Sequence, residues 1–143
     1  MNLSEHFTLA EMTVSESAAR RDISNTPDAN SLENLRRLCT FLEQIRLLVG
    51  RPVLVSSGYR SVELNRVIGG SPHSAHMQGL AADINVPGLL PAALARRIAD
   101  SALMFDQLIL EYDSWVHIGL STASERRQVL TIRKGTSYLP GLV

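Results

Sequence analysis

Cysteine occurs once in this sequence, at Cys39, so no disulfide can form within the chain. Cys39 lies in an apolar helical pattern, which is typical of a buried and unreactive thiol. No apolar run reaches about 18 residues, the length that a membrane-spanning helix needs. The N-terminus also lacks a basic segment followed by an apolar run, so no secretory signal peptide is predicted. We therefore expect cytoplasmic synthesis without membrane insertion, and delivery by a separate system if the substrate lies outside the membrane.

Neither sign of charge dominates, because 14 basic and 14 acidic residues cancel. Such a chain has no excess of lysine and arginine for a phosphate backbone, so a nucleic-acid partner is not expected. Its 143 residues and its hydrophobic content of 45% fit one globular domain with its own core. We expect a single domain over residues 1–143 that acts as a monomer.

Several catalytic motifs are absent as well. There is no His-Glu-x-x-His helix, which excludes the class of metalloprotease that such a helix defines. There is no Gly-x-Ser-x-Gly turn, no Cys-His nucleophile arrangement and no glycine-rich phosphate loop. The chain does contain a histidine and an aspartate within one short segment, Ser74–Ile84, and another histidine in Trp115–Ile118.

The spacing of apolar residues predicts long helices alternating with short strands. Residues 29–49 carry apolar side chains at intervals of three and four, which predicts an amphipathic helix ending at Gly50. Runs rich in apolar and β-branched residues, bounded by turn residues, predict strands. We expect an irregular segment with short helical pieces at 1–28, helices at 29–49, 61–67 and 89–103, strands at 52–56, 81–86, 105–111, 115–120 and 128–133, and a loose tail at 135–143.

His76 and Asp83 lie seven residues apart around Gly79, and His117 lies in a later strand. Neutral imidazole and carboxylate oxygen both bind zinc, and catalytic zinc sites use three protein ligands with a fourth position left for water or substrate. A single histidine on an apolar strand is more often structural, but packing needs alone do not account for this combination. We predict that His76, Asp83 and His117 bind one Zn²⁺.

A catalytic zinc site of this kind also needs a carboxylate that takes a proton from water and passes it to the leaving amine. Glu111 and Asp113 are the candidates. A hairpin centred on Ser114 places Glu111 across from His117 on the same face of the sheet, whereas turn chemistry fully explains an aspartate at position 113. Glu111 is the preferred base, and Asp113 is the alternative.

Two further polar residues border the predicted site. Arg60 follows a strand in Ser57–Ser61, where loop residues often carry function, and its planar guanidinium can hold a carboxylate or a polarised carbonyl. A surface ion pair is the simpler interpretation of Arg60. His73 forms His-x-x-His with His76, so it is either a fourth ligand or a residue at the rim of the cleft.

A family resemblance rests on Ser57-Gly58-Tyr59-Arg60, Leu64-Asn65, Gly69-Gly70, Ser74-x-His76-x-x-Gly79-x-Ala81-x-Asp83 and Trp115-x-His117. These segments resemble the M15 family of zinc peptidases, which includes D-alanyl-D-alanine carboxypeptidases and phage endolysins and shares its fold with the hedgehog signalling domain. The resemblance extends over residues 5–120. Its N-terminal part, Phe7-Thr8-Leu9-x-Glu11 with Ser15 and the helix from Leu35 to Gly50, is similar to the short, single-domain branch of the family.

The resemblance implies an α+β fold in which helices flank a small antiparallel sheet. It implies that His76, Asp83 and His117 are the zinc ligands, and that Arg60 steadies the substrate carbonyl or oxyanion.

The resemblance also implies that Ser74 helps to hold the substrate, and we place His73 and Trp115 beside it as substrate-binding residues. Many members carry the acidic base three residues before the last histidine, where this chain has Ser114. The hedgehog branch carries a glutamate six residues before it, which matches Glu111. Some relatives have a histidine at the position of Trp115.

The predicted function is a zinc-dependent peptidase that cleaves peptidoglycan stem peptides, as a D-Ala-D-Ala carboxypeptidase or as an endopeptidase at a nearby bond. A phage or prophage lysis enzyme, released by a separate membrane-permeabilising protein, fits best, and a host dipeptidase or wall-recycling enzyme is the alternative within the class. The competing class is a catalytically silent, zinc-stabilised binding module of hedgehog-like fold. A zinc-free structural domain is the third possibility.

Overall fold

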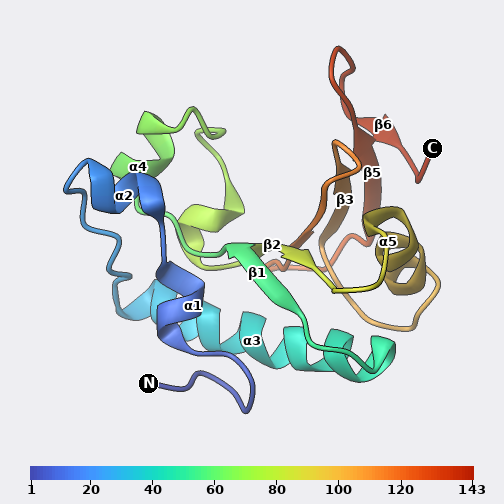
Figure 1. The fold of residues 1–143 in the computed structure, drawn as a ribbon, viewed down its shortest axis with the longest axis horizontal. Coiled ribbons are helices and arrows are strands. Elements are labelled where there is room, and N and C mark those ends of the chain that lie inside the picture. The colour runs from blue at the N-terminus through green and yellow to red at the C-terminus, as the bar shows by residue number, and fades with distance from the viewer.

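The computed structural model describes all 143 residues and has helices around a six-stranded sheet with the strand order β1-β2-β4-β3-β5-β6 (Figure 1). The helices are α1 (Leu9–Thr13), α2 (Glu16–Arg20), α3 (Ala29–Val49), α4 (Val62–Val67), the 3-10 helix η1 (Ala75–Gln78) and α5 (Pro91–Ala99); the strands are β1 (Leu54–Ser57), β2 (Ala81–Asn85), β3 (Gln107–Glu111), β4 (Trp115–Gly119), β5 (Gln128–Ile132) and β6 (Leu139–Pro140). The predicted α+β class, a sheet flanked by helices, is confirmed.

One strand pair departs from the antiparallel sheet that we expected. Strands β3 and β5 are parallel, and every other neighbouring pair is antiparallel. After β4 the chain returns to the end of the sheet where β3 starts, and the backbone N–H groups of Arg127 and Gln128 bond the carbonyls of Phe105 and Asp106 there. Arg126 also pairs with the Asp106 carboxylate at 2.8 Å. Strand β5 therefore begins beside the start of β3 and runs in the same direction.

The two faces of the sheet differ in character, because side chains alternate along each strand and directly paired residues project to the same side. One face is apolar and packs against α3 and α5, and no residue on it is charged. The other face carries polar and charged side chains from three adjacent strands. The apolar face includes Ala82, Ile84, Leu108, Leu110, Val116 and Ile118, and the polar face includes Asp83, Glu111 and His117.

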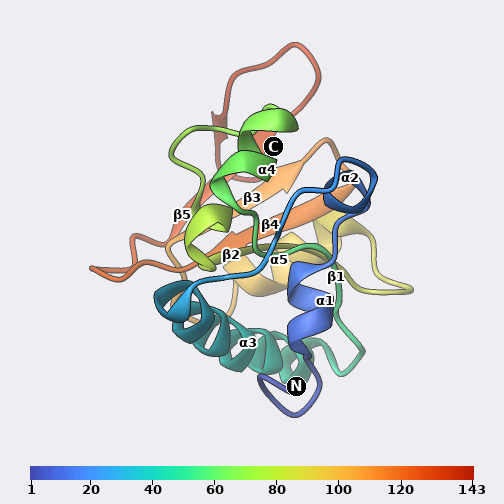
Figure 2. The ribbon, with the colours of Figure 1, turned by 90° about the vertical axis from the view of Figure 1, so that its left-hand side faces the viewer.

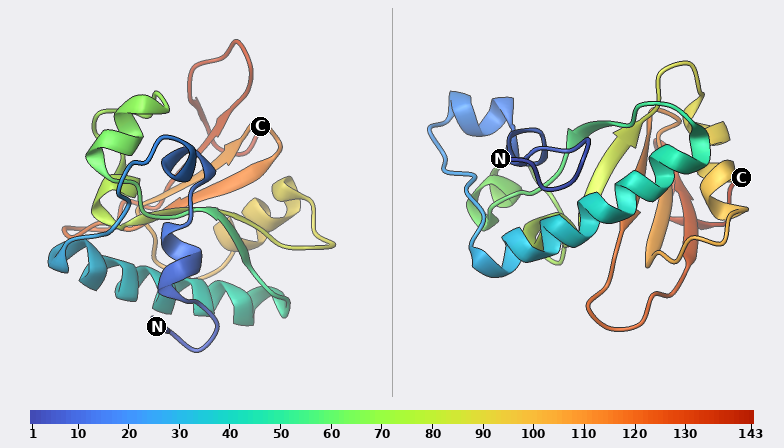
Figure 3. Two further views of the ribbon diagram at one scale, coloured as in Figure 1. Left: turned by 60° about the vertical axis from the view of Figure 1, so that its left-hand side comes forward. Right: turned by 90° about the horizontal axis from the view of Figure 1, so that it is seen from below.

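Helix α3 runs along one side of the molecule, beneath α1 and β1 in the view of Figure 1, and contacts α5 and η1 (Figures 1 and 3). It covers residues 29–49 as predicted; Asp28 caps its start and Gly50, with φ of 66°, ends it. The middle of its apolar stripe, from Leu35 to Ile45, is buried, and each buried leucine contributes about 1.5–3 kcal/mol to folding. Burial also raises the pKa of Cys39, in this stripe, to about 12. No helix in the structure combines the length and apolar character needed to cross a membrane.

The N-terminal segment has the short helical pieces that the sequence predicts, and the capping box between Thr8 and Glu11 is formed. The tail is more ordered than we expected. Strand β6 pairs with β5, and the Thr131 hydroxyl donates to the carbonyl of Gly141 at 2.8 Å. Strand β6 has only two residues, one of them Pro140, and is too short to show an alternating pattern in the sequence. It is recognisable only from its pairing with β5.

Candidate metal centre

His76 lies in the single turn of η1, which is fixed at both ends. The Ser74 hydroxyl accepts a hydrogen bond from the His76 backbone N–H at 3.2 Å and caps the turn. Gly79 ends the turn with φ of 74°, and a Cβ there would lie 2.5 Å from the carbonyl oxygen of Ser31 in α3. In Figure 2 the yellow-green turn of η1 lies between α4 and the start of α3, and Asn34 of α3 donates to the carbonyl of Gln78 at 2.9 Å. The turn is thus anchored to α3 while its histidine ring is directed toward the polar face of the sheet.

Asp83 and His117 are direct partners on β2 and β4, which places both side chains on that polar face. The Asp83 Oδ1 atom lies 3.3 Å from His76 Nε2 and 3.2 Å from His117 Nδ1. The three ligand atoms lie within 4.8 Å of one another, and the three residues are between 2% and 9% exposed. The structure therefore brings together the three side chains that the sequence predicts, and their binding of zinc stays a prediction.

The protonation of His76 indicates that this group suits a cation. Its Nδ1 atom lies 2.7 Å from the carbonyl oxygen of Gly58, which can only accept, so Nδ1 carries the hydrogen. Burial lowers the pKa of His76 and so favours the neutral ring, whose Nε2 is then an acceptor. Burial raises the pKa of Asp83, but the hydrogen bond with His117 and the nearness of both imidazole rings outweigh it, and the pKa lies well below its usual value. A neutral imidazole nitrogen thus faces an ionised carboxylate oxygen, and a metal ion is the partner that both can bind.

Arg60 reaches the cleft beside these ligands. Its backbone N–H bonds the carbonyl of His76 at 3.0 Å, and its Nη1 donates to Oδ1 of Asn65 at 3.0 Å. Asn65 is itself buried and donates to the carbonyl of Ser71. Burial lowers the pKa of Arg60, while the charges of Asp83 and Glu111 act to raise it. Arg60 forms no ion pair, so the surface-pair interpretation is not met, and its guanidinium borders the metal group.

Glu111 lies at the end of β3, on the same face as His117. The hairpin is centred on Asp113, which corrects the prediction of a centre at Ser114: Glu111 is paired with Trp115. The Trp115 Nε1 atom donates to Glu111 Oε1 at 2.7 Å. Burial raises the pKa of Glu111, His117 lowers it and Asp83 raises it. A carboxylate with a raised pKa beside a metal group suits proton transfer.

Asp113 lies apart from the metal group. It is in the tip of the hairpin with φ of 53°, and both of its carboxylate oxygens accept hydrogen bonds from Arg133, at 3.0 and 3.1 Å. Its side chain is 56% exposed and does not line the cleft. The turn accounts for an aspartate at this position, since aspartate tolerates positive φ. Of the two predicted bases, the geometry therefore favours Glu111.

The metal group opens into a cleft of about 800 Å³. The predicted substrate-binding residues His73, Ser74 and Trp115 all line it. His73 is exposed and is not one of the three residues whose ligand atoms converge, so the structure places it at the rim rather than at the metal.

Sequence reasoning missed two aromatic residues of this cleft, Tyr112 and Tyr138. The ring of Tyr112 packs against that of Trp115 at a tilt of 54°, with ring centroids 5.7 Å apart. Tyr138 comes from the segment that we expected to be loose, and burial together with the charge of Glu111 raises its pKa. The Trp-x-His pattern pointed to this wall of the cleft, but no signal in the sequence linked the tail to it.

A buried group of two histidines and one aspartate, at the wall of an open cleft with an arginine and a second carboxylate beside it, is the arrangement of a metal-dependent hydrolytic centre. The family comparison agrees with this class. The Peptidase M15 family model matches residues 5–119, which include all of these residues, and the chain belongs to that family. M15 peptidases are zinc-dependent metallopeptidases. No curated protein matches the sequence at a significant level.

Proposed function

We propose that this protein is a zinc peptidase that hydrolyses stem peptides of peptidoglycan, as a D-Ala-D-Ala carboxypeptidase or as an endopeptidase. The observation that carries the proposal is the convergence of His76, Asp83 and His117, within 4.8 Å of one another, at the wall of a cleft large enough for a peptide. Membership of the Peptidase M15 family supports the same class of reaction.

Zinc bound by these three residues would supply a water that ionises near neutral pH and a Lewis acid for the substrate carbonyl. Glu111 takes up a proton at its carboxylate and delivers it to the nitrogen of the leaving amine. Its hydrogen bond from Trp115 fixes the orientation of that carboxylate. Arg60, held by Asn65, presents its guanidinium to the carbonyl oxygen as negative charge develops there. The Gly58 carbonyl keeps the ring of His76 in one tautomer.

The test is digestion of purified sacculi by the zinc-loaded protein, with the released fragments identified by mass spectrometry. We expect peptide fragments with a new amine or a lost terminal residue, and their masses distinguish a carboxypeptidase from an endopeptidase. Glu111→Gln should keep its zinc and release no fragments. A wild-type protein that binds zinc and releases nothing would favour the silent binding module instead.

A further inference from the structure

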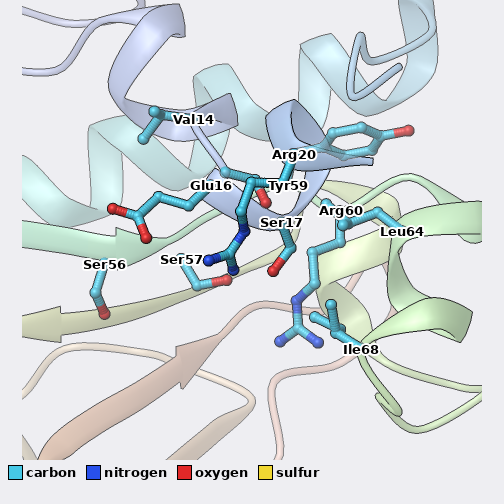
Figure 4. A pocket seen from close by; sticks show the side chains of 11 residues that line it. Val14, Glu16, Ser17, Arg20, Ser56, Ser57, Tyr59, Arg60, Leu64 and Ile68 are labelled. Carbon is cyan, nitrogen blue, oxygen red and sulfur yellow. The ribbon is translucent and has the colours of Figure 1, made fainter. Parts of the chain in front are cut away.

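A second cavity, of about 450 Å³, lies beside the metal cleft (Figure 4). It is formed between α2, the end of β1 and α4, and it shares Arg60 and Ile68 with the metal cleft. None of the predicted metal ligands lines it. Its residues include Arg20 and Ser17 from α2 and Ser57 from β1.

The register of the sheet connects this cavity to the metal group. Ser57 is the direct partner of Asp83, and Asp83 is the direct partner of His117. Asp83 and His117 share the polar face, and a bulge between Val55 and Ser57 brings Ser57 opposite Asp83, so that Ser57 continues this row onto β1. Neighbouring strands lie about 4.8 Å apart, and an extended peptide advances about 3.4 Å per residue. A peptide crossing this row reaches the second cavity about two residues from the bond at the metal.

The two guanidinium groups that line the cavity have no anionic partner in it. Neither Arg20 nor Arg60 forms an ion pair in the structure. The Nε atom of Arg60 is buried and has no hydrogen-bond partner. Glu16 is the one carboxylate in the lining, and it pairs with neither arginine. Figure 4 shows both arginine side chains lining the same cavity as the hydroxyl groups of Ser17 and Ser57.

We propose that this cavity is a substrate subsite for a free carboxylate of the peptide, bound chiefly by Arg20 and lying about two residues from the scissile bond. Guanidinium binds carboxylate through paired hydrogen bonds, and the two serine hydroxyls add donors of the right kind. The inference rests on the proposed function, because it assigns the cavity to the peptide that reaches the metal. The carboxylate is either the free α-carboxylate of a γ-linked glutamate within the stem or the terminal carboxylate of the peptide.

The experiment compares synthetic stem pentapeptides in three forms: both carboxylates free, the glutamate α-carboxylate amidated, or the C-terminal carboxylate amidated. Binding is measured by calorimetry on the zinc-loaded Glu111→Gln protein, which should hold the peptide uncleaved, and KM and kcat are measured on the protein with Glu111 intact. Each is repeated with Arg20→Gln. Arg21→Gln is the matched control, because Arg21 follows in the chain, is also exposed and does not line the cavity.

We expect amidation of one of the two carboxylates to weaken binding about 10- to 100-fold, and the form that does so identifies the carboxylate. Arg20→Gln should abolish this difference and raise KM with little change in kcat, whereas Arg21→Gln should preserve it. Equal binding of all three forms, equal effects of the two arginine substitutions, or no binding at all would overturn the inference. Carboxylate-dependent binding without any turnover would instead refute the proposed function and leave the subsite in place. Turnover without a carboxylate preference would support the proposed function and refute the subsite.

Discussion

The carbonyl oxygen of Gly58 lies 2.7 Å from Nδ1 of His76, and this contact decides which nitrogen of the ring faces the metal group. Gly58 directly follows the strand β1, and a Cβ there would lie 2.4 Å from the carbonyl oxygen of Met12. The close approach of α1 therefore fixes the position of the carbonyl that orients the histidine. The N-terminal segment supports the metal centre from outside it.

Gly58→Ala tests this support. The added methyl group must displace either Met12 or the end of β1, and the carbonyl that holds His76 moves with it. We expect zinc affinity, measured by competition with a chelator, to fall about 10- to 100-fold, the range typical of a lost partner of a metal-binding histidine. Gly50→Ala is the control: its φ of 66° strains an alanine by about 1 kcal/mol, but it lies at the far end of α3 and should leave zinc affinity unchanged. Equal affinities in all three proteins would contradict the account.

Replacing each predicted base by its amide, in Glu111→Gln and Asp113→Asn, shows which of the two acts as the base. Glu111→Gln removes the proton acceptor at the cleft, so kcat should fall about 10²- to 10⁴-fold while zinc is retained. Asp113→Asn loses only an exposed ion pair with Arg133, and kcat should stay within about twofold. Steady-state kinetics on a stem peptide measures both. The opposite pattern would transfer the role of base to Asp113.

The acidic side of the pH profile depends on Glu111. A base acts only when ionised, and burial raises the pKa of this carboxyl, so kcat/KM should decline on acidification at a higher pH than for a free glutamate. The hydrogen bond from Trp115 acts to lower that pKa. Trp115→Phe removes the donor, so the pKa rises further and the acidic limb should move to higher pH. A limb that stays in place or moves to lower pH would show that this hydrogen bond does not control the base.

Tyr138 is expected to contact the substrate. It lines the cleft but lies beyond residues 5–119, the part of the chain that the family model covers. Tyr138→Ala should raise KM about 2- to 10-fold with kcat little changed, since an aromatic contact contributes about 0.5–1.5 kcal/mol. Tyr138→Phe keeps the ring and separates its packing from the hydroxyl group. An unchanged KM in the alanine variant would remove Tyr138 from the binding surface.

Local signals in the sequence were sufficient for much of this structure. The bounds of α3 follow from its apolar spacing and from Gly50, and the capping box at Thr8 is a contact between near neighbours. The His76, Asp83 and His117 set was accessible because ligand chemistry restricts the residue types and strand periodicity fixes the faces.

Features that depend on pairing between segments far apart in the sequence could not be predicted from local signals. The hairpin is centred on Asp113, one residue before the predicted centre at Ser114, because Tyr112 and Asp113 both adopt positive φ and close a tighter turn than expected. The parallel pairing of β3 with β5 is set by contacts from the segment before β5 to the start of β3. Placement of Tyr138 in the cleft depends on β6, which forms only when β5 is already in the sheet.

The most direct test of the account is the zinc content of the purified protein by elemental analysis after dialysis. We predict about one zinc ion per chain in the wild type and less than about a tenth of that in His76→Ala, Asp83→Ala and His117→Ala. His73→Ala, at the rim of the same cleft, should keep its zinc. A folded wild-type protein without zinc, or three ligand variants that retain it, would contradict the claim that these side chains form one metal site.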